Sequence, residues 1–176
     1  VVETLGSTSV ICSDKTGTLT RNEMTLRRTV TADGSVEITG VGYEPAGEFQ
    51  VNGMRAPVPP SVLELLRAGV LASDARLVSD QGRWRIDGDP TEGALVVTAA
   101  KAGLDQAELT HDHPRTHEIP FSSERRRMTT LHGRGDATVA YSKGAAEVLL
   151  ADCVRQRRGH DDVPLSEEER QAFLAR

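Results

Sequence analysis

The chain has 176 residues, of which 38% are hydrophobic and 27% charged, with a formal net charge of −5 and a pI near 5.6. A chain of this size buries the core of one ordinary domain. Its acidic balance argues against a nucleic-acid partner, because phosphate backbones are held by basic surfaces. No apolar stretch approaches the roughly 20 residues that cross a bilayer.

The first predicted element is a strand over residues 9–13, which are short, β-branched and mostly apolar. This pattern is typical of a strand buried on both faces of a parallel sheet. Asp14 then falls at the carboxyl end of the strand, where open α/β sheets gather ligands and catalytic groups. Gly17 allows the tight turn that follows. Asp14 is therefore a candidate nucleophile.

A carboxylate that attacks a phosphoryl group needs a metal ion to offset the charge between two anions, a cation, and hydroxyl or amide donors. Lys15, Thr16 and Thr18 could supply the cation and the donors. The alternative interpretation is an ordinary polar turn after a strand, which Asp-Lys-Thr-Gly would also form.

The next segment changes character. Residues 25–30 and 35–39 alternate like strands of an antiparallel sheet, joined through Asp33-Gly34, a strong hairpin signal. A loop rich in glycine and proline is expected over residues 40–60.

The remaining elements alternate between helices and strands. Ser61 is expected to cap a helix that ends near Ala72, and Asp89 one that ends near Ala102. Ser166 with Glu169 forms a predicted capping box for a last helix. Further strands are expected at residues 84–86, 116–119, 128–132 and 138–142, and a further helix at residues 145–151. This order predicts an α+β fold, an antiparallel sheet with flanking helices.

The segment Asp89-Pro90-Thr91-Glu92 has a sufficient architectural explanation. Asp89 can be the N-cap, Pro90 the first helical residue, and Glu92 the residue that closes a capping box.

Two further segments indicate a ligand. Phe121 precedes three adjacent arginines, as in an aromatic platform for a base beside an electropositive wall. The alternative is a core phenylalanine followed by a solvated basic surface. Lys143 stands where a strand gives way to a helix, a place that the helix dipole makes unfavourable for a cation, so an anionic or π-rich ligand is expected there. Gly144 would allow its close approach.

Residues 14–20, with the flanks 3–6 and 21–24, resemble the phosphorylation motif of P-type ATPases. The segment 121–128 makes the resemblance one to the calcium and sodium/potassium branch. The resemblance implies that Asp14 takes the γ-phosphate of ATP and becomes an aspartyl-phosphate. It also implies that Thr16 helps to hold the phosphate and, with Asp14, Mg²⁺. Related phosphatases with an aspartyl nucleophile carry a second aspartate, a general acid, at the position of Thr16. Threonine cannot act as a general acid near neutral pH, so Thr16 favours a pump over a phosphatase.

The three later segments resemble, in order, motifs of the nucleotide-binding domain of the same family. The resemblance implies that Glu92 accepts a hydrogen bond from the adenine amino group and that Phe121 stacks on adenine. It implies that Arg126 replaces a usual lysine and keeps its charge. Lys143 and Gly144 match the family's Lys-Gly motif, in which Ala146 here replaces a proline.

The resemblance therefore implies the ATP-binding cytosolic portion of a membrane pump that transports cations. Residues 1–24 would be the first strand and phosphorylation loop of a Rossmann-like phosphorylation domain. Residues 25–176 would be the nucleotide-binding domain, cut at its C-terminal side. Phosphorylation, actuator and transmembrane domains of the same polypeptide would be its partners, and the fragment alone would be inactive. The alternatives are a soluble aspartyl-phosphate phosphatase and a non-catalytic nucleotide-binding module.

Overall fold

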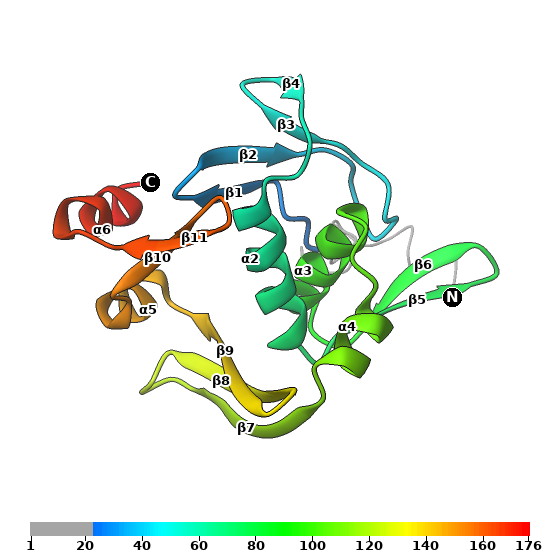
Figure 1. Cartoon of the computed structure of the whole chain (residues 1–176). Coiled ribbons are helices and arrows are strands. Elements are labelled where there is room, and N and C mark those ends of the chain that lie inside the picture. Colours follow the sequence, from blue (N-terminus) through cyan, green and yellow to red (C-terminus); the bar gives the residue numbers. More distant parts are fainter. Residues whose placement is uncertain (1–22) are drawn as a thin grey trace, which may run out of the picture.

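The computed structural model describes residues 23–176 and shows an α+β fold (Figure 1). Small antiparallel sheets surround a central pair of helices, so the predicted α+β class is confirmed. The predicted Rossmann-like strand at residues 9–13 and the loop that carries Asp14 lie outside the described residues.

The first sheet has four antiparallel strands in the order β1-β2-β3-β4. Their bounds are β1 (Arg28–Thr31), β2 (Gly34–Ile38), β3 (Phe49–Val51) and β4 (Met54–Arg55). The predicted first hairpin is present, but its turn is residues 32–33, because Thr31 pairs with Gly34.

The hairpin β3–β4 lies inside the segment that was predicted to be a loop. Its turn is Asn52-Gly53, and both residues have a positive φ, of 52° and 75°. This dipeptide is the preferred sequence for a two-residue hairpin turn. The sequence therefore did carry a signal for these two short strands.

Two helices form the centre of the fold: α2 (Pro60–Leu71) and α3 (Pro90–Lys101). The expectation that Ser61 caps α2 is wrong. The N-cap is Pro59, and Ser61 lies buried in the first turn, with its Oγ 3.0 Å from Thr31 Oγ1. The core joins one side of α2 to the first sheet, with Val62, Leu66, Val70, Val36, Ile38 and Phe49 all buried.

A hairpin and a short helix lie beside α3: β5 (Arg76–Asp80), β6 (Arg83–Asp87) and α4 (Gln106–Asp112). Only residues 84–86 of this unit were predicted as a strand. Gln81 and Gly82 form its turn with positive φ values of 48° and 78°. Asp105 caps α4 by accepting a hydrogen bond from Glu108 N.

The second sheet consists of β7 (Arg115–Ser122), β8 (Arg127–Arg134) and β9 (Ala137–Gly144), in that order. It confirms the three strands expected there. The last elements are α5 (Ala146–Asp152), β10 (Arg155–Arg158), β11 (Asp161–Pro164) and α6 (Glu167–Leu174). In Figure 1, α2 runs from the first sheet towards β9, so it bridges the two sheets. The hairpin β10–β11 was not expected.

The predicted capping box of α6 is confirmed, with Glu169 N donating to Ser166 Oγ at 3.2 Å and Ser166 N donating to Glu169 Oε2 at 3.0 Å. The Ser166 N–H is the main reason that the pKa of Glu169 is lowered from 4.5 to about 2. A lowered pKa in the fold means that the carboxylate contributes stability above about pH 4.5, and that this contribution disappears as the pH falls to about 2.

As the pH falls from about 4.5 to about 2, the free energy of unfolding should decrease less for Glu169→Gln than for the wild type. The reason is that the variant has no carboxylate at this position to protonate. Urea denaturation at several pH values measures this slope. Glu168→Gln, in the same helical turn, is the matched control. An unchanged slope for Glu169→Gln would contradict the assignment.

Candidate functional site

Asp89 positions the start of α3 as predicted. Its Oδ1 accepts hydrogen bonds from Thr91 N at 2.8 Å and Glu92 N at 3.1 Å. Donation from the Glu92 N–H is the largest cause of the lowered pKa of Asp89. Pro90 is the first helical residue, where its missing N–H costs nothing.

The capping box predicted for Glu92 is wrong, because its side chain turns away from Asp89. Glu92 Oε2 instead accepts hydrogen bonds from Asp74 N at 2.7 Å and Ala75 N at 3.0 Å. These two N–H groups belong to the connection between α2 and β5. The prediction missed them because backbone N–H groups leave no residue-type signal in a sequence.

Lys143 comes from the end of β9 and meets Glu92. Its Nζ donates to Glu92 Oε1 at 2.5 Å and to Ser73 Oγ at 3.1 Å. The exposed fractions of the two side chains are 24% for Lys143 and 17% for Glu92, so the ion pair is mostly covered. The sequence predicted an anionic or π-rich ligand beside Lys143. In this structure the carboxylate of Glu92 occupies that position.

The contacts of this pair leave specific hydrogen-bonding capacity. A carboxylate has about four acceptor positions, and Glu92 uses three for the contacts described. An ammonium has three donors, and Lys143 uses two. The pair thus offers one acceptor next to one donor. This arrangement matches a ligand edge that carries a donor beside an acceptor.

Phe121 lies on the same sheet as Lys143. The register of β7 against β8 shifts between Ile119 and Ser122, which leaves Pro120 and Phe121 opposite the single residue Met128. Such a bulge redirects side chains. Met128 in turn pairs with Lys143. Phe121 is 60% exposed, although it is a large apolar side chain.

Gly144 has a structural reason to lack a side chain. A Cβ there would overlap Arg126 O and lie 2.6 Å from Arg127 Cα. The backbone that approaches Gly144 is therefore that of the turn between β7 and β8, which Ala145 N also contacts by donating to Arg126 O at 2.9 Å.

Arg126 stands in that turn with a positive φ of 53°. Its guanidinium forms an ion pair with Glu147 in the first turn of α5, and Arg127 pairs with Asp152 at the end of the same helix. The basic wall predicted beside Phe121 is thus partly neutralised by α5. Asp14, Lys15 and Thr16 lie outside the described residues, so their roles stay predictions.

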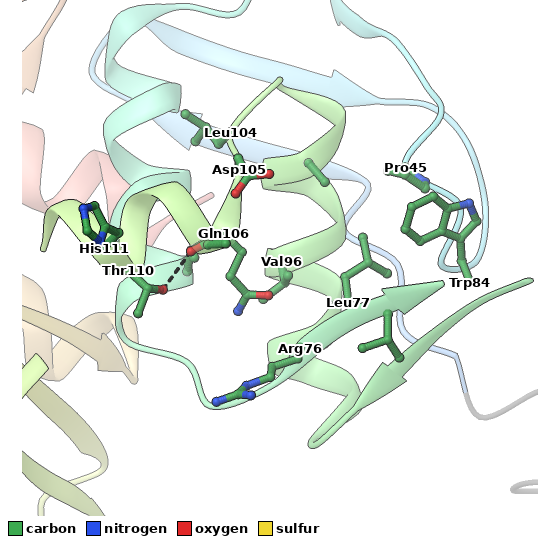
Figure 2. Close-up of a pocket in the computed structure, with 14 residues that line it drawn as sticks. Pro45, Arg76, Leu77, Trp84, Val96, Leu104, Asp105, Gln106, Thr110 and His111 are labelled. Carbon is green, nitrogen blue, oxygen red and sulfur yellow. Dashed lines mark hydrogen bonds between the residues drawn. The ribbon is translucent and has the colours of Figure 1, made fainter. Parts of the chain in front are cut away.

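A cavity of about 650 Å³ lies between the hairpin β5–β6, α3 and α4 (Figure 2). Its walls are largely apolar, with Leu77 and Val96 on one side and Trp84 close to Pro45 at one end. Among the described residues, none of those predicted to bind nucleotide lines this cavity. Its link to the Glu92–Lys143 pair is Gln106, whose Nε2 donates to Ala75 O at 2.8 Å.

The fold and the site define an α+β domain with a paired carboxylate and ammonium, and with an exposed aromatic residue two strands away on the sheet that carries the ammonium. A family model described as the P-type ATPase cytoplasmic domain N matches residues 61–176. The chain belongs to this family, as the sequence motifs indicated. In residues 23–176, no helix combines the length and the apolar character that crossing a membrane requires.

Relatives of the chain are cation-transporting ATPases by name. The chain is 49% identical over 156 residues to the probable cation-transporting ATPase F of Mycobacterium tuberculosis, a match that covers 86% of this chain and 17% of the relative. It is 46% identical over 159 residues to the cation-transporting ATPase pma1 of Synechocystis, with 86% and 18% covered. The calcium-transporting ATPase type 2C member 1 of Bos taurus is 40% identical over 182 residues, with 98% and 18% covered. The chain thus spans less than a fifth of these relatives.

We expect Lys143→Met to lower the free energy of unfolding by about 1 to 3 kcal/mol, because it leaves the mostly covered Glu92 carboxylate without its cation. Urea denaturation measures the change. The control is Arg126→Met, which breaks an ion pair whose two side chains are 53% and 52% exposed. That exposed pair should contribute less than about 1 kcal/mol. Equal losses of unfolding free energy in the two variants would contradict the inference that burial makes the Glu92–Lys143 ion pair more stabilising than the Arg126–Glu147 pair.

Proposed function

We propose that the chain is the ATP-binding cytosolic portion of a P-type cation-transporting ATPase and that adenine binds at the Glu92–Lys143 pair. The observation that carries this proposal is the single acceptor beside a single donor. The Watson–Crick edge of adenine presents its N6 amino donor next to the N1 ring acceptor. Glu92 Oε1 would accept from the amino group, and Lys143 would donate to the ring nitrogen.

Phe121 would add the stacking surface. Its 60% exposure leaves the ring available to a flat ligand. Phe121 lies in the β-bulge opposite Met128, and Met128 pairs with Lys143 on the next strand. A stacked base contributes roughly 1 to 3 kcal/mol. Gly144 would support the same region by holding the end of β9 against the β7–β8 turn.

Arg126 would bind the phosphate side of the nucleotide after leaving Glu147. The exchange costs little, because an exposed ion pair contributes about 0 to 1 kcal/mol. A guanidinium also matches phosphate geometry better than the lysine that is usual in the family.

Phosphoryl transfer would take place in residues 1–24, as the first part of a phosphorylation domain, with residues 25–176 as the nucleotide-binding domain. Asp14 would attack the γ-phosphorus of ATP, forming an aspartyl-phosphate and releasing ADP, with Lys15 and the Thr16 hydroxyl as donors to the phosphate. Mg²⁺ held by Asp14 and Thr16 would reduce the repulsion between the two anions. The remaining domains of an integral membrane protein would couple this chemistry to cation transport.

We expect the chain to bind ATP weakly, with a dissociation constant in the high micromolar to millimolar range, about 4 to 5 kcal/mol. Chemical-shift changes in an NMR titration should cluster at Glu92, Phe121 and Lys143. Phe121→Ala should weaken binding more than the neighbouring control Ser122→Ala, because only the first removes a stacking surface. Shifts confined to the Asp14 loop would rule out adenine binding at the pair.

In the full-length protein, Asp14→Asn should abolish the acid-stable, hydroxylamine-labile phosphoenzyme, because the amide cannot act as the nucleophile. Nucleotide binding should remain nearly intact, since adenine is held elsewhere. Phosphoenzyme assays with labelled ATP and equilibrium binding of ATP measure the two outcomes separately. Phosphoenzyme in the Asn variant would remove Asp14 from its proposed role.

A further inference from the structure

The orientation of Glu92 depends on a short stretch of backbone, residues 73–75, which we call the 73–75 segment. Asp74 N and Ala75 N both donate to Glu92 Oε2, which fixes the carboxylate plane and directs Oε1 towards Lys143. A glutamate without such contacts samples several rotamers. The direction of the remaining acceptor position on Oε1 is therefore set by where this segment lies.

Arg115, the first residue of β7, holds the 73–75 segment in place. Its Nη2 donates to Leu71 O at 3.1 Å and to Ser73 O at 2.7 Å. Its Nη1 donates to the Asp74 carboxylate at 2.6 Å and to Glu118 at 3.0 Å. A planar guanidinium can bridge two carbonyls and a carboxylate together, whereas an ammonium lacks this fixed fork.

The other side of the segment is held as well. Gln106 Nε2 donates to Ala75 O at 2.8 Å, and a Cβ on Gly88 would lie 2.8 Å from Ala75 Cα. The segment is thus fixed between α4, the end of β6 and Arg115. Arg115 supplies the contacts nearest to the N–H groups that bind Glu92.

We propose that Arg115 is a positioning residue that sets selectivity for adenine over other purines. The inference rests on the proposed adenine site. Arg115 has no contact with Glu92 or Lys143 among those described, and it acts through Ser73 and Asp74. Hypoxanthine, the base of ITP, carries a carbonyl and a ring N–H where adenine carries an amino group and a ring acceptor. A fixed Glu92 next to a fixed Lys143 accepts only the adenine pattern.

The test compares ATP and ITP binding to the chain by NMR titration. The wild type should prefer ATP. Arg115→Met should weaken ATP binding about tenfold, which is the loss of roughly one well-oriented hydrogen bond. ITP binding should change little, so the ratio of the two dissociation constants should approach one. Arg115→Lys should give an intermediate ratio, because it keeps the charge near Asp74 and loses the bridge.

The control is Arg67→Met, which removes an arginine of similar exposure, 28% against 26%, that pairs with Glu64 on α2. It should leave the ATP:ITP ratio unchanged. A second readout is the exchange protection of the Asp74 and Ala75 amides without ligand, which should fall in Arg115→Met and remain in the control. If Arg115→Met does not fold, Arg115→Lys gives the decisive ratio.

Equal weakening of ATP and ITP, or an unchanged ratio in both Arg115 variants, would overturn the inference. The Glu92→Gln variant separates this failure from that of the proposed function. If Glu92→Gln loses ATP selectivity while the Arg115 variants keep it, the adenine site stands and only the role of Arg115 is wrong. If the wild type itself shows no preference for ATP, both proposals fail.

Discussion

The end of α2 holds this structure together, because its carbonyl groups need donors that the helix cannot provide. Leu71 O receives Arg115 Nη2 from β7, and His132 Nε2 of β8 lies 3.1 Å from it. His132 is buried and its Nδ1 lies 2.8 Å from His113 O. The Arg115 hydrogen bond attaches the second sheet to the helix that the first sheet covers.

The candidate site follows from this attachment. Glu92 is on α3, which packs against α2, and Lys143 is on β9, which packs against the same helix. Their contact joins residues 51 positions apart. Gly93 allows the start of α3 to approach β6, since a Cβ there would lie 2.6 Å from an Ile86 side-chain carbon. Each partner is thus positioned by packing on α2, and the ion pair forms where those two surfaces meet.

Local signals in the sequence predicted most of the helices and the strands of the second sheet, whereas contacts between residues far apart in the chain could not be predicted. Asp89 was recognised as a cap because its effect extends only three residues. Asn52-Gly53 carried a turn signal that the glycine- and proline-rich surroundings obscured. Glu92 accepts hydrogen bonds from the backbone amides of Asp74 and Ala75, which lie 18 and 17 residues earlier in the chain, instead of closing a capping box. No periodicity or spacing reports that proximity.

The Glu92–Lys143 pair brings together one negative and one positive charge, so the site that would read the base is electrically balanced before any ligand arrives. ATP and ADP carry the same base, and a balanced pair that contacts only this part gains no preference from the lost phosphate. Product would leave the proposed adenine site no faster than substrate. Under the proposed function, exchange of ADP for ATP would be governed by groups that face the phosphates, and the base would only hold the nucleotide on the domain.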